Sequence, residues 1–254
     1  MSQLSEFFQL HQNPKPLLLG NVWDAHSAQL AEKAGFKALG TSSHAIAFSM
    51  GYADGENISF DELFFVLERI LKSVKIPVSV DFEAGYSDNP EEVAKNVEKL
   101  VKIGAVGINL EDGKVVDGKR QLEDADQLAE KIKAIKSKTE IFINARADTY
   151  TTKHPDALKE SIRRANLYAQ AGADGVFVPL IETESDLKIF VNEVEIPLNV
   201  FTTPNLPDYE RLTELGVKRI SHGAKQYDLL MKKSEEIFSE FNLSKKYNWV
   251  LEGK

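Results

Sequence analysis

The fold is decided by a pattern that recurs four times: EKAGFKALG (residues 32–40), VKIGAVGIN (101–109), AQAGADGVF (169–177) and TELGVKRIS (213–221). In each stretch a glycine joins the end of an amphipathic segment to a short apolar run. Glycine ends a helix in the left-handed conformation at little cost, and a short loop then leads into a strand. The pattern therefore predicts repeated helix-to-strand units, with helix ends at Gly35, Gly104, Gly172 and Gly216.

Eight short apolar runs alternate with amphipathic segments along the chain. Runs of this length suit strands that are buried on both faces of a parallel sheet. The expected strands are Leu17–Gly20, Ala38–Thr41, Pro77–Asp81, Val106–Leu110, Glu140–Asn144, Gly175–Val178, Pro197–Phe201 and Val217–Ser221. We expect a (β/α)8 TIM barrel, with a doubly wound open sheet as the alternative. No Ser-, Gly- or Pro-rich linker interrupts the sequence, so we expect a single domain over residues 1–254.

The composition excludes several classes of protein. With 43% hydrophobic and 28% charged residues the chain can bury a sizeable core. Its net charge of −8 argues against nucleic acid or an anionic membrane as a partner. The sequence contains no cysteine, which excludes disulfides, zinc–thiolate sites and a cysteine nucleophile. We find neither a secretion signal nor an apolar run of about 20 residues, and expect a cytoplasmic protein.

Polar side chains gather at the carboxyl ends of the expected strands, where barrels of this type place their active sites. Asp81 and Glu83 lie two residues apart at the end of one strand, and Asn109 and Glu111 repeat that spacing on the next. Side chains two apart on a strand share a face, so we expect both acids to point into the barrel mouth. Crowded carboxylates without His or Cys favour a hard ion such as Mg²⁺, or Mn²⁺. The alternative is that single acids cap helices or pair with lysines.

Arg146 lies within the run INARAD (143–148), at the end of the fifth expected strand and so at the mouth of the expected barrel. A guanidinium at this place can bind a substrate carboxylate or phosphonate through two hydrogen bonds. The alternative is a structural salt bridge to Asp81, Glu83 or Asp148. Ser42 and Ser43, after the second strand, offer hydroxyl and backbone N–H groups to an anion.

The sequence does not decide the role of three further features. The loop GKVVDGKRQ, with Lys114, Lys119 and Arg120, is either a lid or an exposed basic turn. His222, after the last strand, is either an acid or base or a structural hydrogen bonder. The other histidines, His44 among them, give a weaker signal still.

Taken together, five segments resemble the isocitrate lyase/phosphoenolpyruvate mutase superfamily over nearly the whole chain. They are NVWDAHSAQLAEKAGF (21–36), TSSHAIAFSMGYADGE (41–56), VSVDFEAGYSDNPEEVAKNV (78–97), GAVGINLEDG (104–113) and INARADTY (143–150). The resemblance implies a Mg²⁺-dependent enzyme that makes or breaks a C–C or P–C bond next to a 2-oxo or 2-hydroxy carboxylate. It maps the metal-binding acids onto Asp81, Glu83 and Glu111.

The resemblance also implies roles for residues that bind the substrate. The substrate-binding segment falls on Thr41, Ser42 and Ser43, the strand-five arginine on Arg146, and the loop aspartate near the substrate on Asp54. We expect Asp54 and Arg146 to be the catalytic residues, with Asp54 as an acid or nucleophile. We add Asn199, in the polar run NVFTTP, as a further substrate-binding candidate.

A helix exchanged between subunits is a further implication, giving a homodimer or homotetramer. The length of the segment Ala224–Lys254 is consistent with such an exchange, and its tail carries the apolar group Tyr247, Trp249, Val250 and Leu251.

The departures from the superfamily matter equally. The lyases carry a catalytic cysteine in the loop after the fourth strand, which here reads EDGKVVDGKRQLED (111–124). The lyase histidine is replaced by Asn109, and the second metal-site aspartate by Glu83. We therefore do not expect cleavage of isocitrate or methylisocitrate by the usual route.

The sequence predicts a Mg²⁺-dependent lyase that cleaves a C–C bond in a small 2-oxo carboxylate, of the oxaloacetate or phosphonopyruvate type, through a metal-stabilised enolate. The alternatives are phosphonopyruvate mutase or hydrolase chemistry and a non-catalytic barrel that binds a metabolite. A Schiff-base aldolase is disfavoured, because no strand end supplies a lysine.

Overall fold

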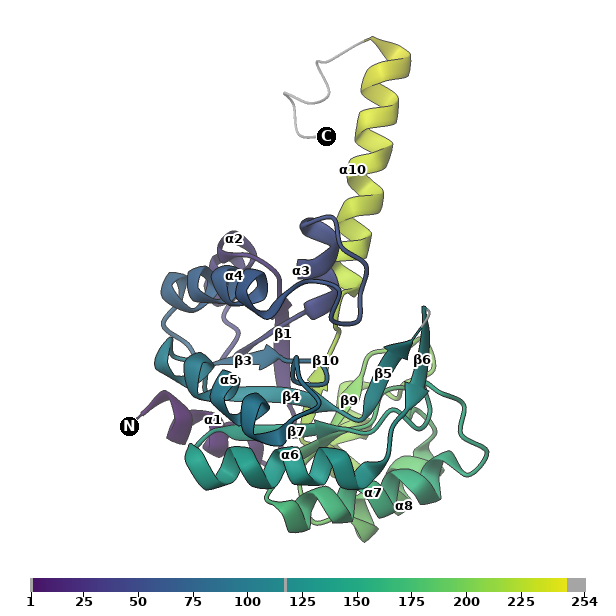
Figure 1. Ribbon diagram of the computed structural model, residues 1–254. Helices are drawn as coiled ribbons and strands as arrows, with labels where there is room; N and C mark the ends of the chain where they lie inside the picture. Colours follow the sequence, from purple (N-terminus) through teal and green to yellow (C-terminus); the bar gives the residue numbers. More distant parts are fainter. Residues whose placement is uncertain (1, 117, 246–254) are drawn as a thin grey trace.

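The computed structural model of the protein describes residues 2–116 and 118–245. Eight parallel strands close into a barrel in the order β1-β10-β9-β8-β7-β4-β3-β2 (Figure 1). Their bounds are β1 Leu17–Val22, β2 Leu39–Thr41, β3 Val78–Asp81, β4 Gly107–Glu111, β7 Phe142–Arg146, β8 Gly175–Phe177, β9 Leu198–Phe201 and β10 Arg219–Ser221. The predicted (β/α)8 barrel is confirmed, and the open sheet is excluded because β1 pairs with both β2 and β10.

Helices follow the strands and cover the outside of the barrel. Their bounds are α1 Gln3–Gln12, α2 Ala25–Lys33, α3 Ser43–Ser49, α4 Phe60–Ser73, α5 Pro90–Lys102, α6 Ala125–Lys138, α7 Ala157–Ala171, α8 Glu184–Glu193, α9 Tyr209–Glu214 and α10 Lys225–Ser244. Local sequence sets where they begin: Ser59 and Glu62 form a capping box at the start of α4. The apolar faces of the helices pack on the strands in one continuous core.

The four glycines of the recurring pattern have the predicted conformation. Gly35, Gly104, Gly172 and Gly216 have φ angles of 94°, 105°, 107° and 85°. Side chains with a Cβ rarely adopt this left-handed region, so glycine ends these helices with little strain.

Helix α1 covers the amino-terminal end of the barrel. Phe7 packs against Phe142, the first residue of β7, with ring centroids 5.2 Å apart. His11 stacks on the same ring at 4.3 Å. A separate apolar cluster thus seals the end of the barrel opposite the expected site.

The segment after β4 is a hairpin, where the sequence left open a lid or a basic turn. It consists of β5 (Gly113–Val116) and β6 (Lys119–Leu122), which pair antiparallel with Val115 opposite Arg120. Figure 1 shows the hairpin standing at the carboxyl end of the barrel. Gly55 contributes to its position, because a Cβ there would lie 2.6 Å from the Val115 side chain.

Helix α10 leaves the barrel and extends away from it (Figure 1). It carries exposed apolar side chains: Leu229, Leu230, Met231, Ile237, Phe238, Phe241 and Leu243. On the barrel itself, Leu18 on the outer face of β1 is also exposed, by 50%. The predicted apolar group at 247–251 lies outside the described residues. Neither α10 nor any other helix in the described part of the chain combines the length and apolar character needed to cross a membrane.

Candidate active site

A cavity of about 330 Å³ opens at the carboxyl end of the barrel. The predicted residues that line it are Thr41, Ser42, Ser43, Asp54, Asp81 and Arg146. Other lining residues come from further elements: Asn21, His44, Asn109, Arg120, Ser221, Lys225 and Asp228. The cavity therefore joins strand ends on several sides of the barrel with the hairpin and the start of α10.

Asp81 is held in the cavity by the segment after β2. Ser43 donates two hydrogen bonds to Asp81 Oδ2, from its backbone N at 3.0 Å and from its hydroxyl at 2.7 Å. Thr41 Oγ1 accepts a hydrogen bond from the Asp81 backbone N at 2.8 Å. The Ser42 hydroxyl accepts from Ala45 N and caps α3. In this structure Thr41 and Ser43 thus position the carboxylate of Asp81.

Arg146 lies in a network of four charged side chains. Its Nη1 is 2.8 Å from Glu111 Oε2, because the two residues are register partners on β4 and β7. Its Nε and Nη2 donate to Asp148 Oδ1 at 2.9 and 2.7 Å. From the hairpin, Arg120 Nη1 reaches Glu111 Oε1 at 2.6 Å and Asp148 Oδ2 at 2.9 Å. The salt bridge to Asp148, which was one of the predicted alternatives for Arg146, is present at the edge of the cavity.

Burial sets the protonation of the two acids in this network. Burial opposes ionisation of Asp148, but Arg146 and Arg120 hold its pKa below the ordinary value. For Glu111 burial prevails, and it raises the pKa although the same two arginines lower it. Of the two carboxyl groups that Arg120 and Arg146 contact, the pKa of Asp148 is lowered and that of the predicted metal ligand Glu111 is raised.

Glu83 does not point into the main cavity, and the prediction that it does so with Asp81 is wrong. Strand β3 ends at Asp81, and Glu83 has a φ of 48°, so the alternation of a strand no longer applies. Glu83 Oε1 accepts from the Tyr86 hydroxyl at 2.8 Å, and Oε2 from Glu56 N at 2.7 Å. Glu83 and Glu111 line a neighbouring cavity of about 200 Å³.

Within the described residues no three or more His, Asp or Glu side chains form a ready-made metal cluster. The charges nevertheless suit a cation. Burial, together with the nearby Glu111 and Asp81, raises the pKa of Glu83 to about 8. Acids that repel one another in this way are stabilised by a bound cation. The donor set therefore fits an oxygen-liganded ion for which waters complete the coordination.

Asn199 and His222 lie away from the cavity surface. Asn199 is 1% exposed, and its side chain binds Asn144 and Ser221 inside the barrel. His222 Nε2 accepts from Asn21 N at 3.1 Å, and burial lowers the pKa of its imidazole. His222 therefore has the structural role that the sequence left as its alternative, while substrate binding by Asn199 has no support from its position.

Several charged groups that line the cavity were not among the predicted site residues, although Arg120 and His44 had been noted with their roles left open. Arg120 could have been found from the dipeptide Asp117–Gly118, since Asp-Gly between two short runs is a strong hairpin signal. His44 follows Ser43 directly and shares its place at the mouth. Lys225 and Asp228 belong to α10, and no local pattern indicates that its first turn reaches the cavity.

The family model for phosphoenolpyruvate phosphomutase matches residues 7–242. The chain belongs to this family. An uncharacterized Mycobacterium tuberculosis protein is 38% identical over 87% of this chain and 83% of its own length. The 2-methylisocitrate lyase of Aeropyrum pernix is 28% identical over 86% of this chain and 73% of its own.

A solved structure from Burkholderia cenocepacia, assigned only provisionally as a phosphonomutase, is similar to this family member throughout. It is 36% identical, covers 93% of this chain and 99% of its own, and gives a TM-score of 0.87. The comparisons confirm the superfamily predicted from the sequence. They identify this phosphomutase family member as a carbon–carbon lyase or phosphonomutase-like enzyme.

Proposed function

We propose that the protein is a Mg²⁺-dependent lyase that cleaves a C–C bond in a small 2-oxo carboxylate of the oxaloacetate type. One observation carries the proposal: Asp81, Arg120 and Arg146 line the same cavity of about 330 Å³. A carboxylate that can hold a cation thus faces guanidinium groups that can bind an anion, which suits a small dianionic substrate. The absence of cysteine favours a cleavage that needs little beyond stabilisation of negative charge.

Asp81 is the residue placed to hold Mg²⁺ at the cavity, with Glu83 and Glu111 contributing through water. When bound, the ion would supply a positive charge at the 2-oxo oxygen, where negative charge develops as the bond breaks. A phosphonopyruvate hydrolase solved with oxalate and Mg²⁺ shares the fold, with a TM-score of 0.87 at 21% identity. That protein supports the choice of ion and of oxalate as a probe.

The remaining residues orient the substrate. Thr41 and Ser43 fix Asp81, and the Ser42 and Ser43 side chains face the same cavity. Arg146, with Arg120 beside it, binds the second anionic group of the substrate. Contacts with Asp148 and Glu111 already hold both arginines in place, and the anion would bind beside these contacts. Preorganised charge of this kind stabilises a transition state without reorganisation.

The test has two parts. Mg²⁺ and oxalate together should raise the melting temperature more than either alone, because ligands that bind only the native state stabilise it. A panel of oxaloacetate, phosphonopyruvate, phosphoenolpyruvate and methylisocitrate with Mg²⁺ then identifies the reaction by release of pyruvate, CO₂ or phosphate. Absence of a joint thermal shift at millimolar ligand would contradict the metal site. A joint shift without turnover would instead favour a metabolite-binding barrel.

P–C bond chemistry is the second candidate. Two guanidinium groups at one edge of the cavity, Arg120 and Arg146, also suit a phosphonate dianion. Phosphate release from phosphonopyruvate, without CO₂ release from oxaloacetate, would select this alternative.

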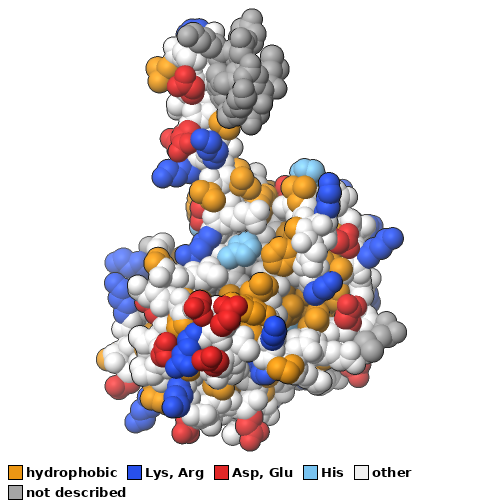
Figure 2. Space-filling model, turned by 180° about the vertical axis from the view of Figure 1, so that it is seen from behind, with side chains coloured by type: hydrophobic (Ala, Val, Ile, Leu, Met, Phe, Trp, Pro, Cys, Tyr) orange, Lys and Arg blue, Asp and Glu red, His pale blue; other side chains and the backbone are white. Residues whose placement is uncertain are grey.

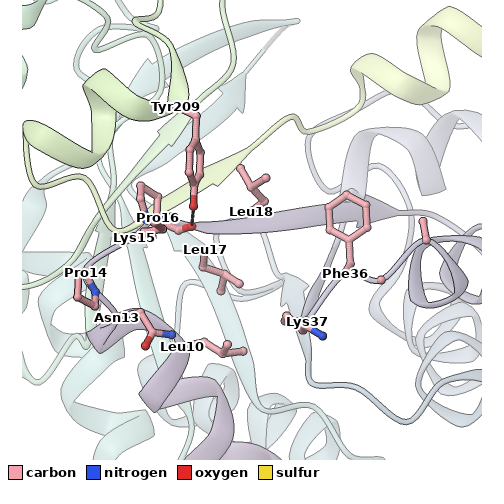
Figure 3. Close-up of a pocket in the computed structure, with 12 residues that line it drawn as sticks. Leu10, Asn13, Pro14, Lys15, Pro16, Leu17, Leu18, Phe36, Lys37 and Tyr209 are labelled. Atoms are coloured by element: carbon pink, nitrogen blue, oxygen red, sulfur yellow. Dashed lines mark hydrogen bonds between the residues drawn. The ribbon is translucent and has the colours of Figure 1, made fainter.

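We also propose that α10 is exchanged between two copies of this chain. The outer face of β1 carries a groove of about 720 Å³, where Leu18 lies between Tyr209 and Phe36 (Figure 3). In a closed barrel a final helix covers this flank, but here α10 stands away with Phe238 74% exposed. Figure 2 shows hydrophobic side chains both on this helix and on the barrel face below it. The α10 helix of a second copy fits the groove, and two exchanges give a homodimer that can pair into a tetramer.

Sedimentation analysis tests the exchange. Phe238→Glu should shift the protein toward the monomer, whereas Lys233→Glu, on the same helix, should leave the assembly intact. A wild-type monomer at micromolar concentration would refute the exchange.

A further inference from the structure

His44 lies between two carboxylates at the edge of the cavity. Its Nδ1 is 3.6 Å from Asp54 Oδ2, and its Nε2 is 3.7 Å from Asp228 Oδ1. The ring stacks on Phe48 with centroids 4.4 Å apart and planes 13° apart. Both ring nitrogens therefore face an acid, and the stacked aromatic ring restricts the imidazole to one plane.

The charges around His44 come from three different elements. Asp54 lies in the loop after α3, Asp228 in the first turn of α10, and Asp81 at the end of β3. Asp54 raises the pKa of His44 most strongly, burial opposes it, and Asp228 and Asp81 raise it further. Lys225 also lines the cavity, from the same turn as Asp228. His44 thus lies among carboxyl groups whose charge favours the protonated imidazolium.

The other groups at the cavity are less suited to move a proton. Burial opposes ionisation of Asp54, but His44 holds its pKa below the ordinary value, so it remains a carboxylate. Arg120 and Arg146 keep their protons at neutral pH. Among the described residues that line the cavity, His44 is the one whose ordinary pKa lies near neutrality.

On the basis of the proposed function, we propose that His44, oriented by Asp54 and Asp228, is the acid that protonates C3 of the product enolate, the task for which this chain has no cysteine. With oxaloacetate, the bond from C3 to the departing carboxylate breaks, CO₂ leaves, and the electron pair remains as the enolate of pyruvate. The His44 imidazolium gives its Nε2 proton to C3, in place of the 3.7 Å contact with Asp228. This transfer forms the new C–H bond and leaves a neutral imidazole. Water returns the proton, so each turnover converts oxaloacetate and one proton into pyruvate and CO₂.

The same acid must work in reverse on pyruvate, which provides the test. In D₂O with Mg²⁺, neutral His44 removes a proton from the pyruvate methyl group and returns a deuteron, and proton NMR follows the loss of the methyl signal. His44→Gln should reduce this exchange by about 100-fold or more, the usual contribution of general acid–base catalysis. The matched control is His26→Gln, on the exposed surface of α2, which should exchange at the wild-type rate.

A second readout uses the protein without metal or substrate. Histidine side-chain NMR should show the pKa of His44 above the ordinary value of a histidine, and Asp54→Asn should lower the pKa of His44. Binding of oxalate with Mg²⁺ to His44→Gln, measured by calorimetry, should remain within about threefold of wild type, since the variant keeps the arginines and Asp81.

The outcomes separate this assignment from the proposed function. If wild type binds Mg²⁺ and oxalate but His44→Gln still exchanges pyruvate within twofold of wild type, His44 is not the acid and the enolate site stands. Absence of exchange in a wild type that binds both ligands likewise overturns the assignment. If wild type binds neither ligand, the proposed function fails and this inference fails with it. If the pKa of His44 is unchanged in Asp54→Asn, Asp54 does not orient His44 and that part of the assignment is overturned.

Discussion

Replacing Gly113 with alanine tests the charged network that joins the hairpin to the barrel. An added Cβ would lie 2.2 Å from Asp148 Oδ2 and 2.9 Å from Arg120 Nη1, so one of them must move. Asp148 is fully buried, and its contact with Arg120 is 2.9 Å long. Removing one partner of a buried pair costs about 3–5 kcal/mol. In Gly113→Ala the Arg120–Asp148 pair is displaced but not removed, and Arg146 still contacts Asp148. We therefore expect a loss of about 2–3 kcal/mol in the free energy of unfolding, or a fall in melting temperature of about 4–12 °C for a chain of this size.

A double-mutant cycle with Arg120→Met shows whether the loss runs through this contact. Denaturant unfolding gives the free energy of each variant. If Gly113→Ala acts by displacing Arg120 from Asp148, the double variant should lose at least about 1 kcal/mol less than the two single losses added together. Losses that add within about 0.5 kcal/mol, or a Gly113→Ala protein as stable as wild type, would refute the reasoning.

Three further predictions concern catalysis and pH. Arg146→Lys should lower turnover efficiency by roughly 30- to 1000-fold on the substrate that the panel identifies, because lysine cannot reproduce the planar fork of arginine. Lys114→Ala, at a half-buried position of the hairpin that pairs with Asp88, should have a much smaller effect. Near-normal Arg146→Lys kinetics in a folded protein would leave Arg146 with its salt bridges alone. A coupled assay should detect no appreciable succinate release from methylisocitrate, and robust release would show that another residue replaces the lyase cysteine. Burial lowers the pKa of His11 to about 3, so wild type should lose stability relative to His11→Gln by about 1.4 kcal/mol per pH unit between pH 6 and 4, with no such drift above pH 7.5; a constant difference across this range would contradict a neutral buried His11.

The strands could be predicted because their signal is repeated and physical. Each of the eight expected runs overlaps an observed strand of the barrel, since buried parallel strands need apolar residues on both faces. The exact ends of the strands were predicted less accurately. The strand expected at Glu140–Asn144 is β7, Phe142–Arg146, so Arg146 belongs to the strand and lies in register with Glu111. That pairing places the two side chains on one face, and it could not be read from either segment alone.

The candidate site was predicted in part for the same reason. Asp81 and Arg146 follow strands whose ends meet at one rim, and both line the cavity. Glu83 departs because its position depends on the left-handed turn after β3, which no preference of glutamate indicates. His44 and Asp228 come together only because α10 begins beside α3, a long-range contact between residues far apart in the sequence.

Strand β10 carries a charged side chain into the interior of the barrel. Arg219 and Ser221 lie two apart on β10, so they share a face, and Ser221 lines the cavity. Arg219 must therefore point into the barrel below the site, where it is 1% exposed and donates to Asn109 Oδ1 at 3.2 Å. Burial lowers its pKa to about 9, and Asp81 opposes this through space. A guanidinium with this pKa remains charged at neutral pH. In a poorly screened interior, an anion in the cavity above it is stabilised by that charge, which favours the same class of ligand as Arg120 and Arg146 at the rim.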